Sequence, residues 1–136
     1  MPTAILSRRE TFSASHRLHS PELNNEENRK LFGKCNHANG HGHNYTLEVL
    51  VKGLINKKTG LVMNLTDLRT IIHTHVLDKV DHKHLNMDVQ EFASLNPTTE
   101  NLAVVIWNWL KPPLGDLLHE VRLHETENNV AIYRGE

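Results

Sequence analysis

The fold of this chain is decided by the stretch HGHNYTLEVLV, which covers residues 41–51. Every second residue, from His41 through Tyr45 to Val51, falls on one face of an extended chain, and mostly polar residues fall on the other. A period of two is typical of a half-buried β-strand. The stretch therefore predicts a strand whose buried face begins with two histidines.

The chain before this stretch predicts a second strand. Residues 12–18 alternate in the same way, and His16 falls on the apolar face with Phe12 and Ala14. The polar residues 19–30 indicate a loop or a short helix, and residues 33–40 indicate a loop. We expect the two strands to be neighbours in one sheet.

The chain after this stretch changes to a helical period. Residues 56–60 indicate a turn and residues 61–63 a short strand. Apolar side chains then recur every three or four residues, which predicts a helix that is capped by Asn64 and ends near Lys79.

The last third of the chain predicts a second helix and a hairpin. Thr98 or Thr99 caps the helix, and Pro112–Pro113 should end it. The strands of the hairpin cover residues 117–126 and 129–134. The order strand, strand, helix, helix, strand, strand predicts an α+β fold with a largely antiparallel sheet.

Composition limits the function classes. The 136 residues suit a single domain over residues 1–136, and the net charge of −1 lacks the basic excess of a nucleic-acid binder. No apolar run approaches the ~18 residues of a membrane span, and no signal peptide is evident. With one cysteine and no signal peptide, we expect a cytoplasmic protein. The 38% hydrophobic fraction hints at an oligomer, and the 11 histidines suggest a metal site or acid–base chemistry.

The strongest chemical signal is the pair His41 and His43. In a strand, residues i and i+2 point to one face and lie ~6.6–6.8 Å apart along it, so both imidazoles can converge on one ion. His16 can supply a third nitrogen from the neighbouring strand, and three protein ligands with an open fourth position are typical of catalytic zinc. The alternative is that two strand histidines lie together by chance.

Cys35, six residues before His41, has two interpretations. It can be a fourth metal ligand, which would make the site structural, or a free thiolate that acts as a base. Lys34 beside it, or more strongly a bound metal, would lower the pKa of the thiol.

Asp81–His82 can form an acid–base relay with Cys35 if a loop conformation aims both side chains at one site; otherwise the pair belongs to a solvated loop.

Glu125 falls on the same predicted strand face as Val121 and Leu123. A carboxylate in an apolar register is costly unless it is paired, so it bonds a partner or binds a ligand. The guanidine-like edge of a heterocycle would suit it through two parallel hydrogen bonds. The alternative is a strand-end carboxylate turned to solvent.

Several motifs, in order along nearly the whole chain, resemble the 6-pyruvoyl-tetrahydropterin synthase family. Motifs that agree in order are far more specific than any one of them. The segments that carry the resemblance are FSASHRL at 12–18, FGKC at 32–35, NGHGHNY at 39–45, LDKVDHKHLNMD at 77–88, PTTEN at 97–101 and HETENN at 124–129.

The resemblance implies a tunnelling fold, in which a four-stranded antiparallel sheet carries two helices packed on one face. Three subunits would close a barrel, and two trimers would stack into a homohexamer with active sites between subunits. Such closure removes the exposed sheet edges of a lone subunit.

The resemblance also implies a reaction. It converts 7,8-dihydroneopterin triphosphate to 6-pyruvoyl-tetrahydropterin and triphosphate, in tetrahydrobiopterin biosynthesis, without an external redox cofactor. The implied cofactor is Zn²⁺, which acidifies C–H bonds of the substrate as a Lewis acid. The implied roles are zinc ligand for His16, His41 and His43, base for Cys35, relay for Asp81 and His82, pterin anchor for Glu125, and pterin-binding segment for Thr98, Thr99 and Glu100.

Two alternatives to this assignment differ in class. The related 6-carboxy-tetrahydropterin synthases typically place three residues between the cysteine and the His-Gly-His motif, whereas here five residues, 36–40, separate them, which favours the pyruvoyl enzyme. A non-catalytic metal-binding or pterin-binding module on the same fold is the other alternative. The presence of Cys35, Asp81 and His82 argues against it, because a binding module needs no base.

Overall fold

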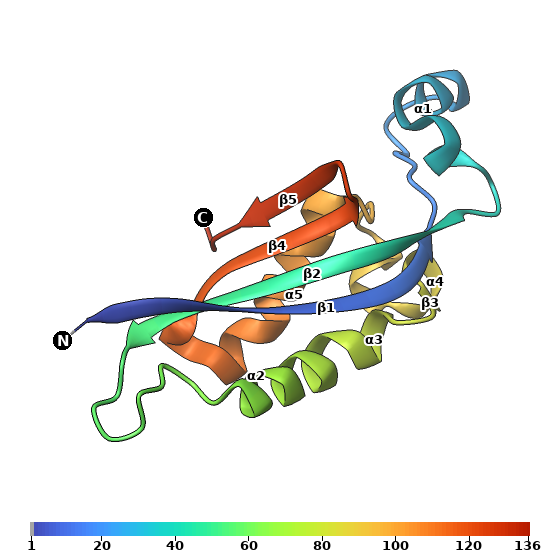
Figure 1. Cartoon of the computed structure of the whole chain (residues 1–136). Helices are drawn as coiled ribbons and strands as arrows, with labels where there is room; N and C mark the ends of the chain where they lie inside the picture. Colours follow the sequence, from blue (N-terminus) through green and yellow to red (C-terminus); the bar gives the residue numbers. More distant parts are fainter. Residues whose placement is uncertain (1) are drawn as a thin grey trace.

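Two long antiparallel strands organise the fold, which this computed structural model describes for residues 2–136. β1 (Thr3–His16) pairs with β2 (His41–Leu54) over the full length of both, from Thr3 opposite Leu54 to His16 opposite His41 (Figure 1). More and less exposed side chains alternate along both strands, but β1 begins well before the predicted residues 12–18 and ends at His16. One end of this hairpin therefore carries His16 and His41 side by side.

The described residues form a five-stranded sheet in the order β3–β1–β2–β4–β5. β4 (Leu118–Thr126) and β5 (Asn129–Tyr133) make the predicted hairpin beside β2. β3 (Lys83–His84) runs parallel to the end of β1. The prediction of a four-stranded antiparallel sheet is therefore wrong, because β3 adds a short parallel strand at the edge. This two-residue strand is a strand only because it pairs with β1. The α+β class is confirmed.

The first helical segment lies against one face of the sheet (Figure 1). α2 (Leu65–Ile72) continues through a π-helical turn (His73–Leu77) into α3 (Asp78–Val80). The side chain of Asn64 accepts a hydrogen bond from the backbone N–H of Thr66 and caps the segment. The predicted start and end of this helix are thus confirmed.

α5 (Thr99–Leu114) packs on the same face and begins at the predicted cap, Thr98. It runs through Pro112 and Pro113 instead of stopping at them. Both prolines lie in its last turn, where water can satisfy the carbonyl groups that they leave without a helical partner. The helix ends at Gly115, whose φ of 57° is a conformation that favours glycine.

The connections hold the short helical elements. α1 projects from the end of the long hairpin, away from the other helices (Figure 1), and a capping box between Asn24 and Glu27 starts it. Residues 61–63 form no strand, so that prediction is wrong; the run is too short to pair without a neighbouring edge. The remaining elements are α1 (Asn25–Phe32), η1 (Gly33–Asn36), α4 (Leu85–Asp88), η3 (Gln90–Ala93) and η4 (Gly115–Leu117).

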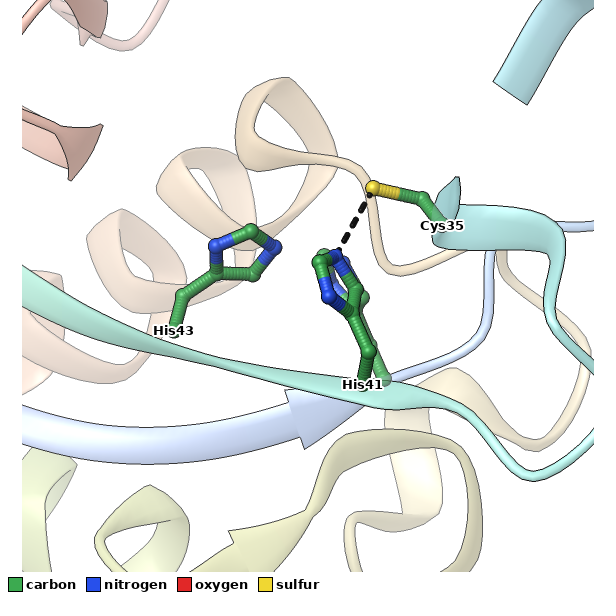
Figure 2. Close-up of side chains that lie close together, drawn as sticks. Cys35, His41 and His43 are labelled. Carbon is green, nitrogen blue, oxygen red and sulfur yellow. Dashed lines mark hydrogen bonds between the residues drawn. The ribbon is translucent and has the colours of Figure 1, made fainter. Parts of the chain in front are cut away.

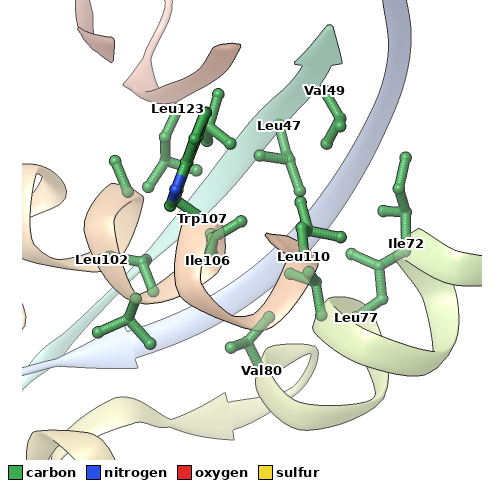
Figure 3. Packing of buried hydrophobic residues seen from close by; sticks show 14 of the residues in the cluster. Leu47, Val49, Ile72, Leu77, Val80, Leu102, Ile106, Trp107, Leu110 and Leu123 are labelled. Carbon is green, nitrogen blue, oxygen red and sulfur yellow. The ribbon is translucent and has the colours of Figure 1, made fainter. Parts of the chain in front are cut away.

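A single hydrophobic core fills the space between the sheet and the helices. Figure 3 shows Leu47 and Leu123 of the sheet facing Ile106 and Leu110 of α5, with Ile72 of α2 beside them. None of the helices formed by residues 2–136 combines the length and the apolar composition that crossing a bilayer would require.

Truncating the core should destabilise the protein far more than truncating its surface. Leu110 is 0% exposed, so Leu110→Ala should lower the free energy of unfolding by about 2–5 kcal/mol. The matched control is Leu65→Ala on α2, where the side chain is 48% exposed, and it should cost about 0.5 kcal/mol or less. Urea unfolding of both variants measures the difference, and equal losses would contradict the assignment of the core.

Candidate metal centre and active site

Three imidazoles converge where the β1–β2 hairpin ends. His41 and His43 rise from the same face of β2, with Gly42 between them (Figure 2), and His16 lies opposite His41 at the end of β1. The ring centroids of His41 and His43 are 4.4 Å apart, and that of His16 lies 4.9 Å from that of His43. The strand period thus brings together the three side chains that the sequence singled out.

Burial favours the neutral form of His16 and His43. Desolvation and the neighbouring His43 lower the pKa of His16 to about 4, and desolvation also lowers the pKa of His43. Within residues 2–136 the buried Nε2 atoms of His16 and His43 have no hydrogen-bond partner. A buried nitrogen without a partner is costly, and a neutral imidazole is the form that binds a metal.

The geometry fits a metal ion. One ligand atom from each of His16, Cys35, His41 and His43 lies within 4.8 Å of the others. Nitrogen and sulfur donors at such separations suit a tetrahedral ion of the zinc type. This donor set is the His/Cys cluster that the sequence predicted, and it is compatible with either role of Cys35.

Tyr45 is a site residue that sequence reasoning missed. Its hydroxyl lies 3.2 Å from Nδ1 of the buried His16, and its ring stacks on Phe12 with centroids 4.9 Å apart. If Nε2 of His16 binds a metal, Nδ1–H donates to the Tyr45 oxygen and fixes the orientation of the imidazole. The available signal was its position, because Tyr45 follows His41 and His43 on the same face of β2.

Cys35 lies in η1, and a hydrogen bond of 3.2 Å joins its Sγ to Nε2 of His41 (Figure 2). Its carbonyl accepts the backbone N–H of Leu18 at 2.7 Å, which fastens this segment to the end of β1. Burial and the charge of Glu125 raise the pKa of the thiol. The expectation that Lys34 lowers this pKa is therefore wrong: Lys34 is exposed, so water screens its charge.

Gly40 allows the loop after η1 to enter β2 close to the end of β1, where His16 and His41 lie opposite each other. Its φ is 77°, and a Cβ there would lie 2.8 Å from the carbonyl oxygen of His16 and 2.9 Å from Nε2 of His84. Any other residue would displace the end of β1, which carries His16. The glycine therefore lets the Cys35 segment and His41 approach the same point.

Glu125 completes the cluster from β4. One carboxylate oxygen lies 3.6 Å from Nε2 of His43, and the other accepts a hydrogen bond of 2.7 Å from the hydroxyl of Thr99. Its side chain is only 17% exposed. The carboxylate is thus held inward at the strand end, unlike the solvent-facing alternative that the sequence left open.

A cavity of about 490 Å³ opens beside Glu125. Thr98, Thr99 and Glu100 line it at the start of α5, and Thr98 also caps that helix by accepting the backbone N–H of Asn101. Leu18 supplies an apolar wall. A flat heterocycle that presents two N–H groups to the Glu125 carboxylate would suit such a cavity.

The Asp81–His82 pair lies elsewhere, at the outer edge of β1. Asp81 accepts the backbone N–H of Ser13 at 3.0 Å and lies 3.0 Å from Nδ1 of His82, and these contacts hold the pKa of Asp81 below its usual range. His82 has a φ of 61° and a side chain that is 83% exposed. In residues 2–136 no hydrogen bond or ion pair joins this pair to Cys35, so one copy of the chain does not form the predicted relay.

The assembled site combines three chemical functions. A metal held by His16, His41 and His43 can polarise oxygen atoms of a ligand, the Cys35 thiol can exchange a proton, and Glu125 can hold the edge of a heterocycle. These functions suit the removal of a proton next to a metal-bound hydroxyl or carbonyl group.

Comparisons with known proteins identify the family of this chain. The sequence profile of the family described as 6-pyruvoyl tetrahydropterin synthase matches residues 5–136. A 6-pyruvoyl tetrahydrobiopterin synthase of Drosophila melanogaster is 54% identical over 98% of this chain and 81% of its own length. The Homo sapiens protein of the same name is 53% identical over 98% of this chain and 92% of its own length.

A solved structure agrees as well. The structure of Caenorhabditis elegans 6-pyruvoyl tetrahydropterin synthase superposes with a TM-score of 0.95 at 40% identity, covering 100% of this chain and 98% of that one. Sequence and fold thus lead to one conclusion: the chain belongs to the 6-pyruvoyl tetrahydropterin synthase family.

Proposed function

We propose that this chain is a zinc-dependent lyase that converts 7,8-dihydroneopterin triphosphate to 6-pyruvoyl-tetrahydropterin with elimination of triphosphate, in tetrahydrobiopterin biosynthesis. Membership of the family supports this activity. The observation that carries it is the meeting of a triple-histidine cluster, a free thiol and an inward carboxylate within one site.

His16, His41 and His43 hold the zinc ion in this proposal. When bound, zinc polarises the hydroxyl and carbonyl oxygens of the substrate side chain and favours the anionic form of the nearby thiol. The unpartnered Nε2 atoms of His16 and His43 support this assignment, as does their neutral state. Tyr45 keeps the His16 ring in place.

Cys35 acts as the base and is not a fourth ligand. It comes from the η1 segment, outside the strand face that supplies the three imidazoles, which suits a group that approaches the substrate side chain from one side. A base at this position removes a proton from a carbon next to the polarised oxygen and returns it to a neighbouring carbon, so the internal redox shift needs no external cofactor. A reducing compartment keeps Cys35 a free thiol, and we therefore assign the protein to the cytoplasm.

Glu125 anchors the pterin ring. Its carboxylate accepts two N–H groups of the pyrimidine edge, and the hydroxyl of Thr99 keeps it aimed into the cavity. Thr98 and Glu100 form the adjoining wall at the start of α5. This contact orients the ring so that its side chain reaches the metal site beside His43.

The protein works as a homohexamer, a dimer of trimers whose barrels close the open sheet edges. In the described residues the outer edge of β1 over residues 3–11 has no strand partner, and β5 is the other edge strand. Val130 and Ile132 of β5 are 46% and 52% exposed, which is unfavourable for a free edge. Pairing of β5 with β1 of a neighbouring copy removes both edges.

The active site then lies between subunits. Asp81 and His82 sit on the β1 edge, where a neighbouring copy would dock, and the His82 ring is exposed toward it. The pair serves as the proton relay for the Cys35 of that neighbouring copy. This assignment explains why both groups are present although one chain keeps them apart.

Replacing the base should abolish turnover without loss of metal. Cys35→Ala should lower kcat by about 10²- to 10⁴-fold, because general base catalysis is lost. Zinc content, measured by mass spectrometry, and affinity for a non-reacting pterin should remain those of the wild type. Loss of zinc in this variant would instead make Cys35 a metal ligand and contradict the mechanism.

Neutralising the anchor should weaken binding selectively. Glu125→Gln replaces a charged acceptor by a neutral one, and a hydrogen bond to a charged group contributes ~1.5–3 kcal/mol, so pterin affinity should fall about 10- to 100-fold. Calorimetry with a non-reacting pterin measures this change, and zinc content should stay normal. If Glu125→Gln binds the pterin with wild-type affinity, Glu125 is not the pterin anchor and the assignment is wrong.

Mixed oligomers test the shared active site. Cys35→Ala and His82→Ala should each be inactive alone, but co-expressed chains should regain about a quarter of the wild-type activity if each site takes one group from each of two subunits. The expected quarter follows from random pairing of equal amounts of the two chains. If both groups act within one chain, mixing restores nothing, and that result would refute the intersubunit site.

A further inference from the structure

A second, more basic cavity adjoins the metal site. It has a volume of about 830 Å³ and is lined by residues of α1, of η1 and of the start of β2, including His41. The cationic side chains of Arg17, Arg29 and Lys34 line it, together with the imidazole of His37. No carboxylate lines this cavity among the described residues. Three permanent positive charges without an opposing carboxylate indicate a site for a polyanion.

These cations are free to bind a ligand. Nε of Arg17 donates to the backbone carbonyl of Asn36 at 3.1 Å, which fixes the guanidinium and leaves its terminal nitrogens available. Asn36 is itself buried and donates to the carbonyl of Leu18 at 2.7 Å, so the floor of the cavity is rigid. Within residues 2–136 none of the three cations forms an ion pair, whereas Lys30 on the same helix lies 3.8 Å from Glu26.

The two cavities adjoin different histidines of the candidate metal site. His41 lines the basic cavity, and Glu125, which lies against His43, lines the other. The boundary between them falls at the end of α1, where Phe32 faces one cavity and the adjacent Gly33 faces the other. A ligand that spans the metal site therefore has its two ends in two chemically distinct cavities.

The proposed substrate has the same order of groups. Its pterin ring is followed by two carbons that bear hydroxyl groups, and the next carbon carries the triphosphate. With the ring at Glu125 and the hydroxyl oxygens at the metal, the triphosphate extends past His41. We propose that Arg17, Arg29 and Lys34 form the triphosphate-binding subsite of this enzyme, an inference that rests on the proposed substrate.

The exposure of this subsite suits a leaving group. Arg29 and Lys34 are exposed, so water and salt screen each contact, and the released triphosphate can depart. Arginine offers paired N–H donors that match phosphate oxygens, and lysine adds a point charge close to Cys35. The subsite thus combines charge recognition of the intact substrate with an open exit for the product.

Two neighbouring residues of α1 allow a matched test. Arg29→Gln removes a charge that lines the cavity, and Lys30→Gln removes a charge from the next position, which does not line it. Arg29→Gln should raise KM for the triphosphate substrate on the order of 10-fold, since a hydrogen bond to a charged group is lost. Lys30→Gln should leave KM within about twofold of the wild type.

Binding of inorganic tripolyphosphate provides a readout that does not depend on turnover. Calorimetry on the zinc-loaded protein should give an affinity that falls in Arg29→Gln by a similar factor, while affinity for unphosphorylated dihydroneopterin stays unchanged. Because tripolyphosphate also binds zinc, the two variants are compared at equal zinc content. Equal tripolyphosphate affinities in the two variants would overturn the subsite.

The outcomes separate this inference from the proposed reaction. If the wild type releases no triphosphate from the substrate, the proposed reaction fails, and the tripolyphosphate comparison still decides the subsite. If the wild type is active but Arg29→Gln and Lys30→Gln have the same KM, the reaction stands and the subsite is wrong.

Discussion

The antiparallel register between β1 and β2 is the constraint on which the rest of the structure depends. It sets His16 opposite His41, and the period of two places His43 on the same face. A shift of one residue would turn every side chain of one strand to the other face, so the core and the histidine cluster would be lost together. The hydrophobic core that Tyr45 and the following residues of β2 join therefore also secures the geometry of the imidazoles.

Site and core form one continuous surface of the sheet. Apolar side chains cover most of the helix-facing side, and at its end the same alternation supplies His16, His41 and His43. Burial there depresses the pKa of His16 and His43, which leaves them uncharged and ready to bind a metal. Burial without a hydrogen-bond partner costs free energy, and the same burial keeps these imidazoles neutral. Binding a metal ion would supply the missing partner.

The sequence predicted those features that depend on local periodicity or on a short motif. The strand pair, both long helices, the final hairpin and the positions of Cys35 and Glu125 are of this kind. It missed the first half of β1, because the polar residues Arg8–Thr11 have no apolar alternation and become a strand by pairing with β2. It missed β3 for the same reason. It also did not place Asp81–His82, because the pair is held at the edge of β1 by hydrogen bonds to the backbone of Ser13, a long-range contact that no local pattern encodes.

The measurement that tests the central claim most directly is anomalous diffraction, recorded on both sides of the zinc absorption edge from crystals of the zinc-loaded protein. The account predicts one peak per subunit, about 2.0–2.1 Å from a ring nitrogen of each of His16, His41 and His43. It also predicts that the Cys35 sulfur stays outside bonding distance of that peak. A peak about 2.3 Å from the Cys35 sulfur, or one away from the three imidazoles, would contradict the account.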